Sequence, residues 1–228
     1  MKDGSFMCFR KLKQNVQDWD KMLGDVSNNI GTFPDQLGAR LIGRWKSGCP
    51  VALSTDFDNK TIAADPKQVN NFTYVRGQHL ASPAGAHIRK TFPRGDLPDG
   101  ALERSRILRR GIPYGNEISA DPTGERGLLF VCYQSNLANG YQFIQQSWAN
   151  SETFFDPNAG LDVTMGQNNN DPDGQYSMQG LMPANLTRPT SFSAINKFVV
   201  PKGGEYFFMP SMTALKTTLA GVKAKAEL

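Results

Sequence analysis

One of the two histidines in the chain has neighbours that are suited to binding iron and an anionic ligand. His87 follows the small residues Ala84-Gly85-Ala86, and Arg89 comes two positions later. Arg109 lies further on, in an alternating basic and apolar segment. A neutral imidazole can bind iron, and guanidinium groups can pair with carboxylates or face an anion. These residue types suit a haem pocket, although a single histidine before basic residues also occurs in surface turns.

Several short segments of the chain carry more specific information because they occur in a fixed order. They are LIGRWKSGCPV, AHIRKTFPRGDL, ILRRGIPYG, GLLFVCYQS and GGEYFFMP. Together they resemble the C-terminal half of fungal dye-decolourising peroxidases, from about Asp3 to about Pro210. The resemblance implies that residues 1–228 form one haem-binding C-terminal domain and that the N-terminal domain of the family is absent.

The resemblance implies that His87 is the proximal ligand of haem b iron, with His79 as the alternative ligand. A ligating histidine normally donates its other ring N–H to an acceptor, which raises its basicity. The family places an aspartate there, in a segment of the form G-x-D-P-x-x-G-Q. Asp162 matches this segment, but Val163 stands where the family has proline. The alternative for Asp162 is an ordinary turn or capping residue.

Two arginines match haem-pocket positions of the family. On an extended segment, Arg89 and His87 would project to the same side, so the Arg89 guanidinium would reach a haem propionate. Arg109 resembles the distal arginine, which steadies bound peroxide and the charge that develops as its O–O bond breaks. Arg110 would point to the opposite face of the strand.

Four further residues match catalytic positions of the family. Leu128 and Phe130 match apolar residues that line the distal pocket, a role that is compatible with core packing. Tyr114 and Trp148 match positions from which some family members oxidise bulky dyes at the surface by electron transfer. The alternative for both aromatic residues is simple packing.

The chain also departs from the family. The family's G-x-x-D-G motif, whose aspartate moves a proton during peroxide activation, has no counterpart here. Ser82-Pro83 replaces the usual Cys-Pro before the histidine.

The resemblance as a whole implies a peroxidase that uses hydrogen peroxide to oxidise dyes and phenols in one-electron steps. The alternative is a truncated haem-binding or haem-free α+β domain without turnover.

The pattern of elements predicts a ferredoxin-like α+β sandwich, which is half of the two-domain, dimeric α+β barrel arrangement. We expect strands at residues 5–12 and 127–133, helices at residues 14–26 and 137–148, and a hairpin of residues 198–200 and 205–209 around Pro201-Lys202-Gly203-Gly204. A long insertion, roughly residues 46–103, carries His87. Residues 168–196 are expected to form a second wrapping loop.

Composition excludes several classes of function. The net charge of +4 is scattered over the chain, which argues against nucleic-acid binding. No apolar run approaches the roughly 20 residues of a membrane span. The three cysteines, Cys8, Cys49 and Cys132, lack metal-site spacing, and Cys8 and Cys132 lie in apolar strand-like runs that predict buried free thiols. Oligomeric state and compartment stay open, and secretion is possible if an upstream signal has been lost.

Overall fold

The computed structural model describes residues 3–98, 100–167, 175–181, 189–193 and 197–221. Its main element is an antiparallel sheet of strand order β2-β4-β1-β7, in which β3 also pairs with β4. The strands are β1 (Ser5–Gln14), β2 (Leu108–Arg109), β3 (Ile112–Tyr114), β4 (Gly127–Gln134) and β7 (Val199–Met209). Two further strands, β5 (Gln175–Gln179) and β6 (Pro189–Ser193), form a separate antiparallel pair.

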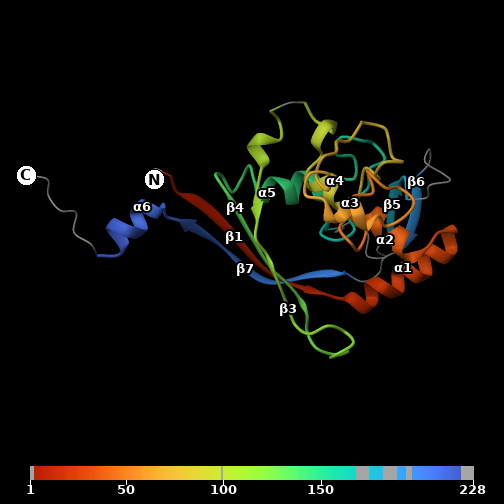
Figure 1. Ribbon diagram of the computed structural model, residues 1–228, viewed down its shortest axis with the longest axis horizontal. Helices are drawn as coiled ribbons and strands as arrows, with labels where there is room; N and C mark the ends of the chain where they lie inside the picture. Colours follow the sequence, from red (N-terminus) through yellow and green to blue (C-terminus); the bar gives the residue numbers. More distant parts are fainter. Residues whose placement is uncertain (1–2, 99, 168–174, 182–188, 194–196, 222–228) are drawn as a thin grey trace, which may run out of the picture.

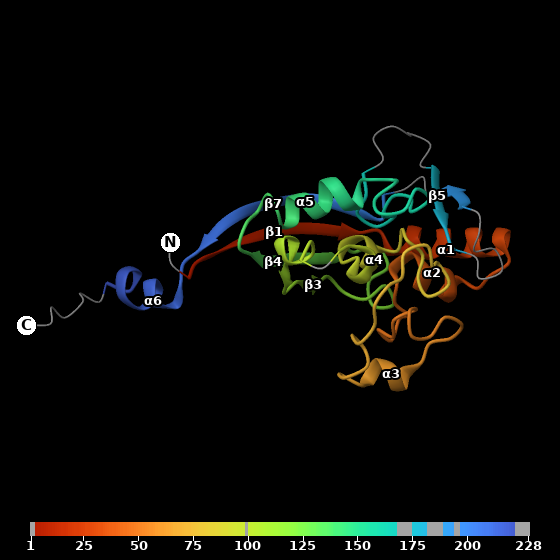
Figure 2. The same ribbon diagram turned by 90° about the horizontal axis from the view of Figure 1, so that it is seen from above.

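The helices are short apart from the first two. They are α1 (Val16–Ile30), α2 (Pro34–Ile42), α3 (Lys60–Ala64), α4 (His87–Thr91), α5 (Tyr141–Phe143) and α6 (Met212–Ala214). Single turns of tighter or wider helix are η1 (Arg94–Asp96), η2 (Glu103–Ser105), η3 (Ile144–Ala149) and η4 (Leu215–Leu219). Figures 1 and 2 both place α1, α2, β5 and β6 at one end of the sheet and α6 beyond the other end.

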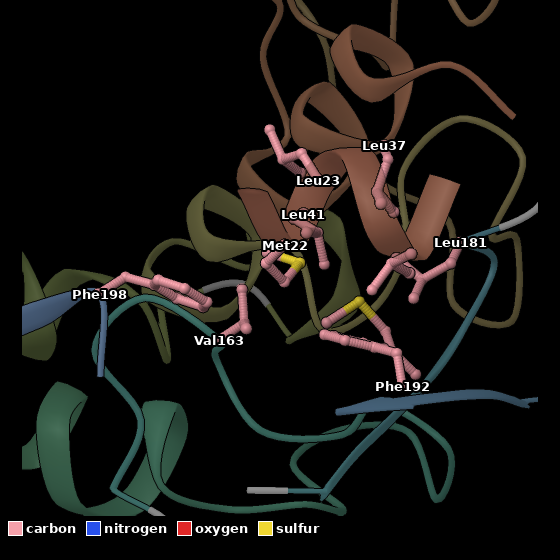
Figure 3. Close-up of a cluster of buried hydrophobic side chains, with 10 residues drawn as sticks. Met22, Leu23, Leu37, Leu41, Val163, Leu181, Phe192 and Phe198 are labelled. Atoms are coloured by element: carbon pink, nitrogen blue, oxygen red, sulfur yellow. The ribbon is translucent and has the colours of Figure 1, made fainter. Parts of the chain in front are cut away.

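The main apolar core lies at the helical end of the molecule. The buried face of α1 carries Met22, Leu23 and Val26, the spacing of an amphipathic helix. These side chains pack with Leu37 and Leu41 of α2 and with residues from later parts of the chain (Figure 3), namely Val163, Met178, Leu181, Phe192 and Phe198. The core therefore joins the first two helices to the β5–β6 pair and to the start of β7.

Two cross-strand rows of side chains run over opposite faces of the sheet. Arg109, Cys132, Cys8 and Tyr206 pair in that order across β2, β4, β1 and β7, and we call this set the cysteine row. The neighbouring pairs give a second row on the other face, Leu108, Tyr133, Met7 and Phe207, which we call the open row. The faces differ because successive strand residues point to opposite sides.

The predicted ferredoxin-like α+β sandwich is confirmed, with some differences in its elements. The first helix runs on from the predicted end near Val26 to Ile30, where Gly31 closes it in a left-handed conformation (φ 72°). The second predicted helix begins only at Tyr141, after Gly140, and its last turn, η3, is a π-helix. Residues 175–181 and 189–193 of the expected wrapping loop at 168–196 form β5, the turn after it and β6, and the rest of that segment lies outside the described residues.

The hairpin predicted around residues 201–204 is wrong, because residues 199–209 form one continuous strand, β7. β1 offers a partner over this whole length, and a register shift between Lys11 and Leu12 absorbs the irregularity. Gly204 suits this pairing because a Cβ there would overlap the Phe9 carbonyl oxygen. Gly204 therefore permits a close strand contact where its neighbours have the composition of a turn.

The predicted insertion at 46–103 contains α3, α4 and η1, connected by turns. Its compactness comes from polar anchors, described below, more than from regular structure. Within the described part of the chain, no helix is long and apolar enough to cross a membrane.

Candidate functional site

The candidate site is built around His87, the first residue of α4. The small residues before it allow tight packing: Ala84 and Ala86 are fully buried, and a Cβ on Gly85 would overlap the Ala159 carbonyl oxygen. The His87 side chain itself remains about a quarter exposed, at 24%. The imidazole is thus held at the edge of a packed region with one side accessible.

Asp162 orients the imidazole. Its Oδ2 lies 2.7 Å from His87 Nδ1, and Thr164 Oγ1 lies 3.0 Å from the same nitrogen. Asp162 is fully buried, and its Oδ1 accepts hydrogen bonds from Thr164 N and Oγ1 at 2.9 and 2.6 Å. Burial alone would raise the pKa of Asp162, but the contacts with His87 and Thr164 hold this pKa below its ordinary value. An ionised Asp162 places the ring proton on Nδ1 and leaves the Nε2 lone pair available as a ligand.

Three contacts hold α4 in place. Gly43 ends α2 with φ 96° and has no Cβ, which lets Ile88 of α4 pack where that Cβ would be. Lys90 is fully buried and donates to the carbonyls of Ser151 and Gly160 at 2.5 and 2.8 Å. Burial lowers the pKa of Lys90 to about 8. The helix is therefore fixed to α2 on one side and to the loop after η3 on the other.

The structure corrects the extended geometry expected for Arg89. Residues 87–91 are helical, so Arg89 and His87 project to opposite sides of α4. Arg89 is 1% exposed and pairs with buried Asp96 through two hydrogen bonds of 2.6 and 2.7 Å. Its remaining N–H groups donate to the carbonyls of Val75, Gln78 and Ser82. Arg89 thus organises the insertion from inside, and its donors are already used.

Arg94, which the sequence analysis did not single out, lines a cavity of about 320 Å³ with Arg106, Phe72 and Phe92. The Arg94 guanidinium lies 3.8 Å from the centre of the Phe72 ring, and its Nη1 donates to the Phe72 carbonyl at 2.7 Å. Its backbone is left-handed, with φ 47°. The one feature of the sequence that could have pointed to Arg94 is its place in the same family-like segment as His87, shortly after α4.

Positive charge extends from this cavity toward the sheet. Arg44 stacks near the Phe72 ring at 5.7 Å. Burial lowers the pKa of Arg44. The nearby Tyr74 acts in the opposite direction, and the positive charge of Arg109 lowers this pKa further. Arg109 is exposed at the end of the cysteine row. The backbone N–H of Arg110 donates to the Val131 carbonyl of the neighbouring strand β4. Arg109, Arg44 and Arg94 form an electropositive region that suits anionic groups.

Leu128 and Phe130 are half-buried on the same face of β4 as Cys132. Phe130 packs against the Tyr141 ring of α5 at 5.7 Å between centres. Both predicted readings, core packing and pocket lining, are compatible with this place. α5 therefore covers the face of the sheet that carries Arg109.

The two candidate relay aromatics lie in different surroundings. Trp148 is only 4% exposed and stacks on Phe154 at 5.0 Å, with Phe143 at its edge. Tyr114 is half-buried, donates to Glu125 Oε1 at 3.2 Å and lies under the Lys11 ammonium. The buried ring contacts of Trp148 are those of an ordinary packed aromatic residue. Tyr114 is partly exposed, so its ring is accessible to solvent.

His79, the alternative ligand, is 4% exposed. Its Nε2 lies 3.5 Å from Asp156 Oδ2, and its Nδ1 has no partner in the described residues. Burial lowers the pKa of His79. With Nε2 facing a carboxylate and the ring enclosed, His79 is a poorer candidate for an iron ligand than His87.

Known proteins match this chain over most of its length. The family model described as "Dyp-type peroxidase, C-terminal" matches residues 1–157. The dye-decolorizing peroxidase msp1 of Mycetinis scorodonius is 40% identical over 243 residues, covering 96% of this chain and 47% of that protein. The dye-decolorizing peroxidase AauDyP1 of Auricularia auricula-judae is 41% identical over 238 residues, covering 93% of this chain and 46% of the relative. The chain thus spans about half the length of these relatives.

Solved structures give the same result. An ancestral D-type dye decolorizing peroxidase superimposes with a TM-score of 0.82 at 44% identity, covering 95% of this chain and 52% of that one. A decolorizing peroxidase from Auricularia auricula-judae gives a TM-score of 0.82 at 40% identity, covering 96% of this chain and 54% of the other. The similarity extends through both the sheet and the insertion that carries His87.

Proposed function

The chain belongs to the Dyp-type peroxidase family, and from this premise we propose that it is the haem-binding C-terminal domain of an enzyme that oxidises dyes and phenols with hydrogen peroxide. The observation that carries the proposal is the His87–Asp162 pair. An imidazole at the edge of a packed helix, fixed by a buried carboxylate through Nδ1, presents Nε2 as an iron ligand.

The residues present fit a haem b group. Nitrogen from imidazole suits haem iron, and the carboxylate behind it makes the imidazole a stronger electron donor. Arg94 and Arg106, at their cavity, replace Arg89 as our candidates for pairing with the propionates, because Arg89 has no donor to spare. When bound, the haem supplies one-electron redox chemistry.

The other residues have positioning and electrostatic roles in this proposal. Arg109 holds peroxide and stabilises the negative charge on the departing oxygen. Leu128 and Phe130 keep water from the same face of the sheet. Tyr114 offers an exposed route for electrons from dyes, and Trp148 a buried one.

An acid–base group for peroxide is the part that this chain does not supply. The G-x-x-D-G motif is absent from the sequence, and Arg109 cannot act as a base because a guanidinium carries only N–H donors and no acceptor. We therefore assign full turnover to a protein in which the other half of the family fold is present. The second candidate function is a haem-binding or haem-free domain without turnover, and the missing motif favours it for the chain alone.

The test is reconstitution of the purified chain with hemin. We expect a Soret band for the wild type, its loss in His87→Ala, and its retention in His79→Gln. Circular dichroism of each variant checks that the fold survives. Loss of the band in His79→Gln together with retention in His87→Ala would overturn the assignment of the ligand.

A further inference from the structure

Cys8 of β1 and Cys132 of β4 stand directly opposite each other, and both are fully buried. They occupy the middle of the cysteine row, so their side chains leave the sheet on the same face. The described structure shows both as free thiols. Cys132 Sγ also accepts a long contact of 3.7 Å from Gln134 Nε2. Two thiols are thus enclosed side by side across one strand pair.

The strand register fixes how the two cysteines face each other. Gln14 N donates to the Arg126 carbonyl at 2.9 Å, and pairing continues without a shift toward Cys8. In an antiparallel sheet, hydrogen-bonded pairs alternate with non-hydrogen-bonded ones, so every second pair counted from Gln14–Arg126 is hydrogen-bonded. Cys8 and Cys132 are such a pair, and the Cα atoms of such pairs lie about 5.5 Å apart. This separation matches the commonest one in disulfides, about 5.5–6 Å. Because Cβ atoms are further apart in such pairs than in non-hydrogen-bonded ones, the bond would be under some tension and readily reduced.

We propose that Cys8 and Cys132 are a redox-active pair that forms a reversible cross-strand disulfide between β1 and β4. The oxidant is hydrogen peroxide, and the reaction needs no haem. The Cys8 thiolate attacks one peroxide oxygen and the O–O bond breaks, which gives a sulfenic acid and hydroxide. The Cys132 sulfur then attacks the Cys8 sulfur and expels the second oxygen. The two thiol protons complete the products, so two thiols and one peroxide give one disulfide and two waters.

The surroundings assign different roles to the two sulfurs. The hydrogen bond with Cys132 favours the thiolate form of Cys8, whereas burial disfavours it. The Arg10 guanidinium lies two residues further along β1 on the same face, and its positive charge favours the thiolate as well. Together these contacts lower the pKa of Cys8, whereas the Cys8 contact and burial raise the pKa of Cys132. Cys8 is thus the attacking thiol and Cys132 the resolving one. Since Arg109 is the next member of the row, the disulfide would form beside the residue assigned to peroxide.

Cys49 provides an internal reference. It packs in a separate cluster with Trp45 and Val51, and its Sγ contacts the Pro50 carbonyl at 3.7 Å. We therefore expect Cys49 to stay a thiol when the other two are oxidised.

The experiment counts thiols in the full 228-residue chain without hemin. Reduced protein is treated with hydrogen peroxide, or with diamide as an oxidant independent of peroxide, then denatured and alkylated with iodoacetamide. Intact mass should show three labels before oxidation and one after it, with dithiothreitol restoring all three. Peptide mapping should find Cys8 linked to Cys132 and the label on Cys49. Because haem is absent, failure of the peroxidase assignment would leave this result unchanged.

Matched variants make the outcome specific. Cys49→Ser should give no label after oxidation, whereas Cys8→Ser should keep two labelled thiols with either oxidant. Cys132→Ser should keep two labels after diamide but only one after hydrogen peroxide, because Cys8 then stops at a sulfenic acid that no second thiol resolves. Three labels after treatment with both oxidants would overturn the proposal. A disulfide that includes Cys49, or one that joins two chains on a non-reducing gel, would overturn it as well.

Discussion

Asp162 acts on His87 through one short hydrogen bond, so its charge can be tested apart from its shape. Asp162→Asn keeps the size of the side chain but removes the negative charge behind the imidazole. We expect hemin affinity to fall about 10- to 100-fold, as for other residues that orient metal-binding histidines. The reduction potential of the bound iron should rise, because a less basic imidazole donates less to it.

The potential separates the charge effect from loss of packing. A variant that binds hemin weakly at an unchanged potential would show that Asp162 only supports the fold here. Thr164→Val is the matched control, since it removes the hydroxyl near His87 Nδ1 but keeps the carboxylate. Its potential should stay close to that of the wild type.

Arg109 and Arg110 form a natural pair for testing the assignment of sheet faces. If Arg109 stabilises charge on peroxide, Arg109→Leu should slow the reaction with hydrogen peroxide about 100- to 1,000-fold, the usual cost of one such donor. The measurement is stopped-flow absorbance with a protein in which the N-terminal half of the family fold is restored. Arg110→Leu should cost far less, and equal losses would mean that the two faces have been confused.

Arg89 shows why residue roles inferred from spacing need the local backbone. The spacing of two from His87 places both side chains together on a strand but apart on a helix. The sequence signal for a five-residue helix was too short to recognise, and α4 exists because Arg89, Lys90 and Ile88 are anchored by distant partners. Asp162, by contrast, lies against His87 where its local motif led us to expect it, because this contact depends on a loop whose sequence resembles the family segment. Its role behind an iron ligand stays a prediction.

At the scale of elements, α2 and α4 meet at a position that only glycine fills. Gly43→Ala would add a Cβ that overlaps Ile88 and would strain a left-handed backbone. We expect a loss of about 2–4 kcal/mol in the free energy of unfolding, from backbone strain and overpacking together. Hemin binding should weaken too, because α4 carries His87. Urea denaturation and Soret titration measure the two effects.

Gly24 is the control for this change. It lies within α1, and a Cβ there would meet nothing within 4 Å. Gly24→Ala should stabilise the chain by roughly 0.5–1 kcal/mol, since glycine is unfavourable inside helices. If the two variants had the same effect, the packing of α2 on α4 would not depend on Gly43.

The longer elements could be predicted and the shorter ones could not, for a physical reason. α1 buries Met22, Leu23 and Val26 on one face, and β1 and β4 are runs of mainly apolar and aromatic residues, so these elements are visible in the sequence. The Lys202-Gly203-Gly204 segment has a turn composition, but its partner strand decides its conformation, and that partner is almost two hundred residues away in β1. The π-helical turn of η3, which packs on α4, has no signal in the sequence pattern that predicted a helix there.

At the scale of the whole molecule, the open row is the apolar surface that a second domain or a partner would cover. Phe207 and Leu108 are 43% and 54% exposed, and Met7 and Tyr133 between them are half-buried. Ile112, on the edge strand β3, is 64% exposed. An apolar face that crosses four strands of a sheet is a surface that drives association when nothing covers it. On the opposite face α5 packs over β4 beside the cysteine row, and Arg109 at the end of that row stays exposed.

We therefore expect the chain expressed alone to self-associate and to turn over little dye, even with hemin added. Light scattering should show oligomers that dissociate in Phe207→Ser/Leu108→Ser, because these substitutions make the open row polar without touching His87. Joining an upstream segment that bears G-x-x-D-G should restore both a single species and peroxide-dependent dye oxidation, since it covers the open row and supplies the acid–base group. A monodisperse chain that oxidises dye at the rate of the joined protein would show that this half is self-sufficient, and it would remove the reason for assigning turnover to the longer protein.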